Sequence, residues 1–329
     1  MKTRILGKTG FSVSEIGLGC WQLGNDFGPM EDVEAEQILT TASEQGINLF
    51  DTADVYGGGM SEQRIGQWLA KQSAQTAKPI VISKVGRDGA LFPDGYSKEK
   101  VRKNIEGTVS RLGVDALDLV QLHCIPPNVL KDGEIFTWLS EFQQQGLIKN
   151  FGASVETIEE ALLCTEVDNL ATLQIILNIF RQDAATQLLP IAEEKNIGII
   201  VRLPLASGLL SGKMQKNRQF SAQDHRQYNR DGQAFHVGET FNGIEFETGV
   251  DLANEAKALL PENLNLLQAS LRWLLDQPAV STIISGASSA QQVISNAQVS
   301  DLPPLSSALH QSLNTFYQEK VKQHIRGGI

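Results

Sequence analysis

The feature that most constrains the fold is a repeated alternation of short, apolar, strand-like runs with helix-like stretches. Such alternation is typical of a parallel sheet whose strands are connected by covering helices. A length of 329 residues is normal for one (β/α)8 TIM barrel with insertions. We therefore predict a single barrel domain over 1–329. The expected strands centre near Leu18, Leu49, Val81, Leu119, Phe151, Ile175, Ile200 and Ile283.

Helix signals lie in the gaps between these runs. Ser97 precedes an apolar stripe of helical spacing that Gly113 is expected to end. Segment 157–160 has a capping-box pattern, and a further helix is expected over about 32–46. Each gap thus has a candidate connecting helix or room for one.

Two stretches depart from the alternation. Segments 3–6 and 13–16 flank the turn-like sequence 7–10, which predicts an N-terminal β-hairpin before the first barrel strand. Segment 213–250, after the seventh strand, is polar and punctuated by Gly. A loop this long is usually functional or disordered, so a lid over the site and a mobile insertion both stay open.

The composition limits the partners and the compartment. A net charge of −10 argues against nucleic acid, because phosphate binding needs a basic face. No apolar run has the length of a membrane span, and no signal peptide is recognised, so we expect a cytoplasmic protein. Its three cysteines, Cys20, Cys124 and Cys164, suit reduced thiols, and no metal motif is found. The oligomeric state is not predicted.

Four polar residues, Asp51, Tyr56, Lys84 and His123, lie at or just past the ends of apolar strand-like runs. In a parallel barrel the carboxyl ends of the strands meet at one face, where catalytic residues gather. A phenol, an amine, a carboxylate and an imidazole would then share one pocket. That set suits proton transfer to a carbonyl oxygen.

These residues carry a family resemblance. Segment 49–62 resembles the aldo-keto reductase signature around its catalytic Asp and Tyr, and Lys84 and His123 match the family's Lys and His. Further matching segments follow in the family's order at 152–154, 174, 208–213 and 286–289. The pattern is most similar to the bacterial and potassium-channel β-subunit-like branch.

The resemblance implies a barrel that binds NADP(H) and transfers a hydride between nicotinamide and an aldehyde or ketone. Tyr56 would donate the proton, with Lys84 lowering its pKa from the usual value of about 10. Asp51 would pair with Lys84, and His123 would orient the substrate carbonyl. A small-molecule carbonyl compound is the expected partner, in an aromatic-tolerant pocket that does not identify it.

The resemblance also implies a cofactor site. Ser154 and Gln174 would bind the carboxamide, the loop from Pro204 to Lys213 the pyrophosphate, and the segment after Gly286 the adenosine end. The implied cofactor-binding residues are Gly19, Trp21, Asp51, Ser154, Gln174, Arg202, Pro204, Leu205, Gly208, Gly212, Lys213, Gly286, Ser288, Gln292 and Asn296.

The chain departs from the family pattern at three of these places. Val155 replaces the usual Asn, and Asn178 could compensate. Arg202 replaces an aromatic residue; it either stacks on the nicotinamide and disfavours the oxidised form, or turns toward a carboxylate or phosphate. Ser288 replaces a cation that would bind the 2′-phosphate. The resemblance still implies that NADP(H) is preferred, and the missing cation leaves NAD(H) possible.

Three functions are consistent with this sequence. An NADPH-dependent reductase of aldehydes or ketones leads. A cofactor-binding regulatory or scaffolding protein with little turnover is the alternative, although it would not need Tyr56. A phosphate-binding isomerase or metal-dependent hydrolase on the same barrel fits less well, because the matching motifs all belong to one family.

Overall fold

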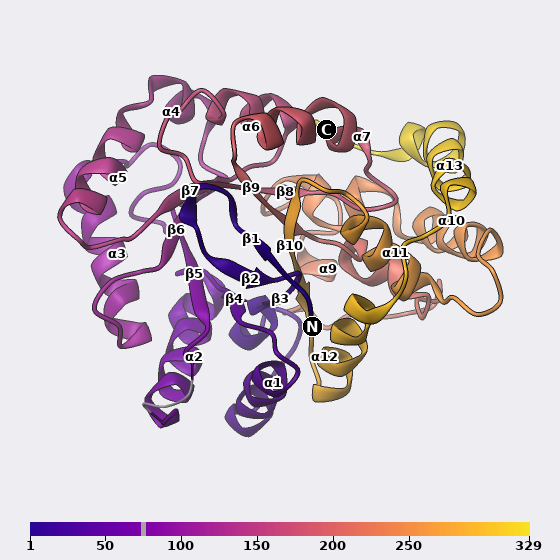
Figure 1. Ribbon diagram of the computed structural model, residues 1–329, viewed down its shortest axis with the longest axis horizontal. Helices are drawn as coiled ribbons and strands as arrows, with labels where there is room; N and C mark the ends of the chain where they lie inside the picture. Colours follow the sequence, from indigo (N-terminus) through magenta and orange to yellow (C-terminus); the bar gives the residue numbers. More distant parts are fainter. Residues whose placement is uncertain (74–76) are drawn as a thin grey trace.

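A computed structural model describes residues 1–73 and 77–329. Eight parallel strands close into a barrel in the order β10-β3-β4-β5-β6-β7-β8-β9 (Figure 1). Every predicted strand centre lies in one of them, which confirms the predicted barrel. Their bounds are β3 Ile16–Gly19, β4 Leu49–Asp51, β5 Ile80–Val85, β6 Leu119–His123, β7 Phe151–Ser154, β8 Thr172–Ile176, β9 Gly198–Arg202 and β10 Val280–Gly286.

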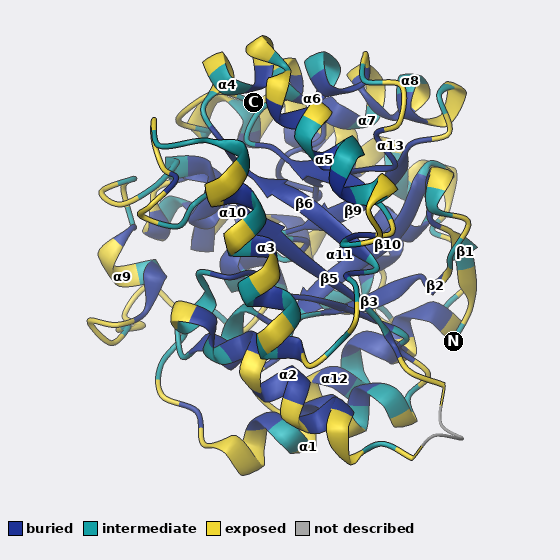
Figure 2. Ribbon diagram, turned by 90° about the vertical axis from the view of Figure 1, so that its left-hand side faces the viewer, coloured by how far each residue is buried: buried dark blue, intermediate teal, exposed yellow. Residues whose placement is uncertain are grey.

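Helices surround the strands and expose their outer faces, whereas the strands are buried (Figure 2). No helix in the described ranges is long and apolar enough to cross a membrane. The helices are α1 Asp32–Glu44, α2 Met60–Lys71, α3 Lys98–Leu112, α4 Pro127–Asp132, α5 Glu134–Gln144, α6 Ile158–Cys164, α7 Asp183–Gln187, α8 Leu189–Glu194, α9 His225–Tyr228, α10 Phe246–Ala258, α11 Leu266–Leu275, α12 Ala290–Ala297 and α13 Ser307–Phe316.

The predicted helix boundaries follow from local capping. The Ser97 side chain accepts a hydrogen bond from Lys100 N at the start of α3, and Gly113 ends the helix at φ 67°. Thr157 and Glu160 form the predicted capping box of α6. These contacts confirm the signals recognised in the sequence.

The predicted N-terminal hairpin is present and lies across the amino end of the barrel (Figure 1). Its strands are β1 Thr3–Ile5 and β2 Ser12–Ser14. Leu6 and Val13 pack with inward-facing strand residues such as Leu49. A Cβ on Gly7 would lie 2.1 Å from Gly198 N, so only glycine allows this approach. The hairpin closes the end opposite the polar residues.

The barrel interior changes from apolar to polar along each strand. Residues two apart share a face of a strand, so Leu49 and Asp51 both point inward, as do Ile82 and Lys84. The first of each pair belongs to the apolar cluster beneath the hairpin. The second lies one layer closer to the carboxyl end. A polar layer therefore rests on an apolar floor.

The predicted long loop is shorter than expected. Segment 213–250 was expected to be irregular, but α10 begins at Phe246, and Glu245 caps its first turn by accepting from Glu247 N and Thr248 N. Gly249 lies inside this helix, and because glycine disfavours a helix interior, the sequence does not indicate the helix there. Gly249 faces Leu209, where a Cβ would lie 2.6 Å from Leu209 Cδ1. The long segment, hereafter residues 213–245, contains α9 and two single 3-10 turns.

Candidate active site

Lys84 is the centre of the polar layer. Its Nζ donates to Asp51 Oδ1 at 2.5 Å, Thr52 O at 2.8 Å and Tyr56 OH at 3.2 Å. An ammonium has three hydrogens, so these partners use its whole donor capacity. Because the Tyr56 oxygen accepts from Lys84, the phenol's own hydrogen is left to point at another acceptor.

Backbone geometry brings Asp51, Lys84 and Tyr56 together. Asp51 ends β4 and pairs in register with Ile82 on β5, which places Lys84 just beyond it. The chain then turns through Tyr56–Gly59 with left-handed Gly57 and Gly58. A Cβ on Gly57 would lie 2.3 Å from Gly24 O. This tight turn returns the Tyr56 ring to the Lys84 ammonium.

The pKa values correct one expectation. Burial raises the pKa of Tyr56 to about 12, and the opposing effect of Lys84 is smaller. The prediction that Lys84 brings the Tyr56 pKa below its ordinary value is therefore wrong. Burial opposes the charge on Lys84, but Asp51 and Tyr56 outweigh it and raise the Lys84 pKa. The phenol is thus neutral and the amine charged near neutral pH.

His123 ends β6 beside Tyr56, with ring centroids 5.9 Å apart in an edge-on arrangement. Burial, and then the charges of Arg87 and Lys84, hold its pKa well below the ordinary value. The imidazole is therefore neutral. Its Nδ1 is buried and has no hydrogen-bond partner among the described residues. A neutral imidazole next to the phenol can hydrogen-bond a polar ligand atom.

Gln174 connects the layer to the expected carboxamide site. Its Nε2 donates to Asp51 Oδ2 at 2.8 Å and to Gln121 Oε1 at 2.9 Å, while its Oε1 accepts from Ser154 Oγ at 3.3 Å. Both amide hydrogens and one Oε1 lone pair are used, so the second lone pair of Oε1 remains for a ligand. Gln121 was not predicted, although its polar side chain at an inward strand position was a usable signal.

Aromatic side chains of the long segment cover this layer. Trp21, which follows β3, stacks on Tyr56 with ring centroids 5.7 Å apart and planes 20° apart. From the long segment, the ring centroid of His225 lies 4.4 Å from that of Trp21, and the ring centroid of Phe235 lies 6.2 Å from it. Of the two alternatives for this segment, the structure shows it folded over the site, where it contributes side chains.

Arg202 belongs to a ring of four ionisable side chains, here called the charge ring. Arg202 Nη2 lies 3.2 Å from Glu156 Oε2 and its Nη1 lies 3.4 Å from Glu239 Oε2. Arg87 Nη2 bridges the same two carboxylates at 2.5 Å each. Arg202 thus turns toward carboxylates, the second of the two alternatives stated for it. Arg87, Glu156 and Glu239 were missed, because nothing in the sequence brings these loop residues together.

The pKa values of the two glutamates in the charge ring shift in opposite directions. Burial and the neighbouring Glu239 carboxylate raise the pKa of Glu156 to about 8. Although burial opposes it, Arg87 and Arg202 hold the Glu239 pKa well below its ordinary value. The Cys124 Sγ and one carboxylate oxygen each of Glu156 and Glu239 lie within 4.8 Å of one another, which is close enough to ligate one metal ion. Any metal ion there would have to displace two guanidinium groups.

The expected pyrophosphate loop forms a tight turn after β9. The 3-10 turn Ala206–Ser211 contains left-handed Ser207 and Gly208 and ends at Gly212, with Lys213 exposed after it. Pro204 and Leu205 lead into this turn. The predicted compensation by Asn178 is not supported. Its Nδ2 donates to Leu203 O and to Asn242 Oδ1, so it fastens the long segment instead.

The expected adenosine end lies on β10 and α12. Gly286 pairs with Gly19 at the strand ends, and a Cβ on Gly286 would lie 2.1 Å from the Gln22 side chain. Ser288 N and Oγ both donate to Gln292 Oε1, at 2.8 and 3.2 Å. Asn296 Nδ2 reaches Gly286 O at 3.5 Å. All the predicted cofactor residues therefore lie at the carboxyl end of the barrel.

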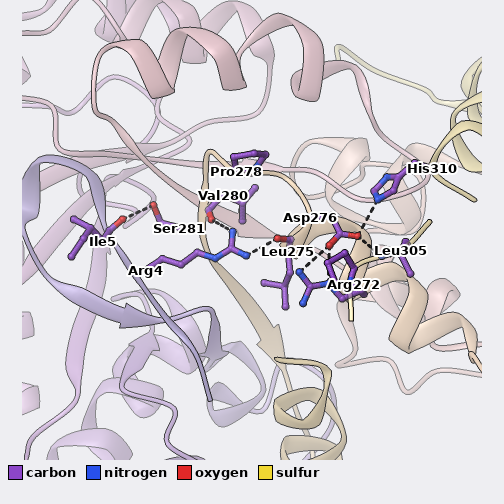
Figure 3. A pocket seen from close by; sticks show the side chains of 11 residues that line it. Arg4, Ile5, Arg272, Leu275, Asp276, Pro278, Val280, Ser281, Leu305 and His310 are labelled. Atoms are coloured by element: carbon purple, nitrogen blue, oxygen red, sulfur yellow. Dashed lines mark hydrogen bonds and ion pairs between the residues drawn. The ribbon is translucent and has the colours of Figure 1, made fainter. Parts of the chain in front are cut away.

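A cavity of about 550 Å³ lies at the opposite end, where β10 begins (Figure 3). Its charged groups are held within its own wall. Arg4 donates to the carbonyl groups of Leu275 and Val280, and Asp276 contacts Arg272 and His310. This cavity therefore offers few unused polar groups and is separate from the Tyr56 site.

Residues 15–318 match the model of the Aldo/keto reductase family, so this chain belongs to that family and is an oxidoreductase. It is 29% identical over 309 residues to the uncharacterized oxidoreductase YqkF of Bacillus subtilis, with 92% of each chain covered. It is 26% identical over 319 residues to a probable voltage-gated potassium channel subunit beta of Oryza sativa, with 93% of each covered.

A solved structure has the same architecture. The glycerol dehydrogenase AKR11B4 from Gluconobacter oxydans superimposes with a TM-score of 0.78 at 27% identity, covering 100% of this chain and 97% of that chain. Together with the two relatives, it confirms the resemblance to the bacterial and potassium-channel branch.

The Glu156 pKa predicts a pH-dependent stability. The ordinary carboxyl value is 4.5 and the folded value is about 8, so the folded protein holds a proton that the unfolded chain releases between them. This contribution is complete below the lower value and is lost as the pH rises through the upper one. We expect the melting temperature of the wild type, relative to Glu156→Gln, to fall between these two values.

The exposed Glu159 of α6 provides the control, because Glu159→Gln removes a carboxylate from the same helix region without touching the charge ring. Its melting temperature should follow the wild type at every pH. Parallel curves for the wild type and Glu156→Gln would contradict the raised pKa.

Proposed function

We propose that this protein is an NADPH-dependent reductase that converts an aldehyde or ketone into an alcohol. The observation that carries the proposal is the buried contact of Lys84 Nζ with Tyr56 OH at 3.2 Å, backed by Asp51 at 2.5 Å. It leaves one phenolic hydrogen free to be donated, next to a neutral imidazole.

The residues present fit a nicotinamide cofactor. Gln174 Oε1 has one lone pair left to accept from a carboxamide NH2, and the Ser154 hydroxyl, which donates to the other, lies beside it. The glycine-containing turn at Gly208 and the exposed Lys213 suit a pyrophosphate. When bound, NADPH would supply the hydride.

The protein's own part is to orient the carbonyl and deliver a proton. Tyr56 donates its hydrogen to the carbonyl oxygen, and the adjacent Lys84 ammonium stabilises the phenolate that remains. Neutral His123 hydrogen-bonds the same oxygen and fixes its direction. Asp51 holds Lys84 in place. The covering Trp21, His225 and Phe235 exclude water from this transfer.

Loss of the proton donor should remove turnover. Tyr56→Phe keeps the ring but loses the hydroxyl, so we expect kcat/KM for a neutral aromatic aldehyde to fall by about 10² to 10⁴-fold. NADPH oxidation measures this. Tyr228→Phe, which removes a half-exposed phenol of the long segment, should stay close to wild type.

Two results would contradict this part of the proposal. A fully active Tyr56→Phe protein would show that another group is the acid. A wild type that quenches NADPH fluorescence but reduces no aldehyde or ketone would favour the cofactor-binding regulatory alternative.

The cofactor preference should be modest. We propose that the Ser288 hydroxyl and the first amides of α12 contact the 2′-phosphate without a cation at position 288. NADPH should therefore bind severalfold more tightly than NADH in a fluorescence titration, and Ser288→Ala should narrow the difference. Ser295→Ala, on the same helix, should not. Equal affinity for both cofactors in the wild type would disprove the preference.

A further inference from the structure

We infer that the substrates of this site are carbonyl compounds that carry a carboxylate, and that Arg87 and Arg202 bind that carboxylate. The inference rests on the proposed reductase function. The two guanidinium groups already bind a carboxylate of this kind, since Glu239 of the long segment contacts both, at 2.5 Å and 3.4 Å.

The charge ring lies next to the reacting groups. Arg202 Nη2 lies 3.5 Å from the Sγ of Cys124, the residue after His123. Arg87 lies three residues after Lys84, just past the end of β5 at Val85. The charges of Arg87 and Arg202 both act on His123, and that of Glu239 acts on Tyr56. A ligand held by these arginines would therefore place a neighbouring carbonyl near Tyr56 and His123.

The charges at this place do not cancel. Three arginines, Arg87, Arg202 and Arg181, face two glutamates; Asp183 also acts on Arg181 but is itself paired with Lys322. At least one positive charge is therefore left in a protein of net charge −10. Arg181 Nη2 is held by the carbonyl groups of Glu156 and Gly328 rather than by a carboxylate. The half-buried His236, 3.5 Å from Glu156, is neutral because burial and Arg181 lower its pKa.

Two buried guanidinium nitrogens also lack a hydrogen-bond partner in the described part of the chain. Arg202 Nε and Arg181 Nη1 have no hydrogen-bond acceptor among the described residues, although both side chains are more than nine-tenths buried. A buried donor without an acceptor is costly, so these guanidinium groups keep donor capacity that Glu156 and Glu239 do not use. Carboxylate is the group that a guanidinium binds in a two-pronged geometry.

Glu239 is the carboxylate that a substrate would replace. It belongs to the long segment, whereas Glu156 directly follows β7 and is fixed by the barrel. The Glu239 backbone is held separately, because Ser207 Oγ donates to its carbonyl oxygen. The side chain can therefore leave the two arginines while the segment stays in place.

The test compares two aldehydes that differ in one charge. Wild-type protein with NADPH is assayed with 4-formylbenzoate and with its neutral methyl ester, at low ionic strength because salt screens the effect. One added charge-assisted contact corresponds to about tenfold in affinity or more. We expect kcat/KM for the acid to exceed that for the ester by about that factor.

Three variants locate the preference. Arg87→Met should lower the acid-to-ester ratio severalfold, because it removes one of the two guanidinium groups and leaves Arg202. Glu239→Gln should raise the ratio severalfold, because it removes the competing carboxylate. Arg102→Met removes a surface arginine of α3, paired there with Glu106, and should leave the ratio unchanged.

The outcomes separate this inference from the proposed function. Reduction of the ester with no preference for the acid overturns the carboxylate subsite alone. Reduction of neither aldehyde rejects the proposed function, and the subsite with it. If Arg87→Met weakens NADPH binding without changing the ratio, the arginines serve a cofactor phosphate and the inference fails. Should Arg87→Met not fold, the wild-type ratio and Glu239→Gln still decide.

Discussion

The carboxyl end of the barrel depends on one buried ammonium group. Removing a charge from water costs several kcal/mol, and the Lys84 side chain is only 1% exposed. The cost is offset because all three ammonium hydrogens have partners, one of them the Asp51 carboxylate. This requirement fixes Lys84, and Lys84 in turn fixes the Tyr56 oxygen. The geometry proposed for proton donation follows from satisfying the ammonium.

A second set of charged groups, the charge ring, connects the long segment to the carboxyl end of the barrel. The charge ring joins two strand ends and the segment after β7 to Glu239 of the long segment. Aromatic contacts from His225 and Phe235 to Trp21 add to this connection. The contacts around Lys84 position the proton donor, and the charge ring provides charges that can select a substrate. A relative described as a probable potassium channel subunit shares the family with dehydrogenases, so the chemistry of these residues must decide between functions.

The sequence predicts the residues around Lys84 well and the charge ring poorly. Asp51, Lys84 and His123 end apolar runs whose period of two fixes their inward direction, so the barrel brings them together without any loop. Glu156 and Glu239 lie on separate irregular segments, and only the folded long segment places them around Arg202. The predicted direction of the Tyr56 pKa shift was wrong for a related reason. The sequence shows the charge of Lys84 but not the burial that outweighs it.

The most direct test of the Asp51–Lys84–Tyr56 unit is a double-mutant cycle on aldehyde reduction with Asp51→Asn, Lys84→Met and the double variant. Residues that act as one unit show strongly non-additive losses. We expect the double variant to lose about as much kcat/KM as the more damaging single variant. Losses that simply multiply would show that the two residues act independently and would contradict a Tyr56 donor held by their ion pair.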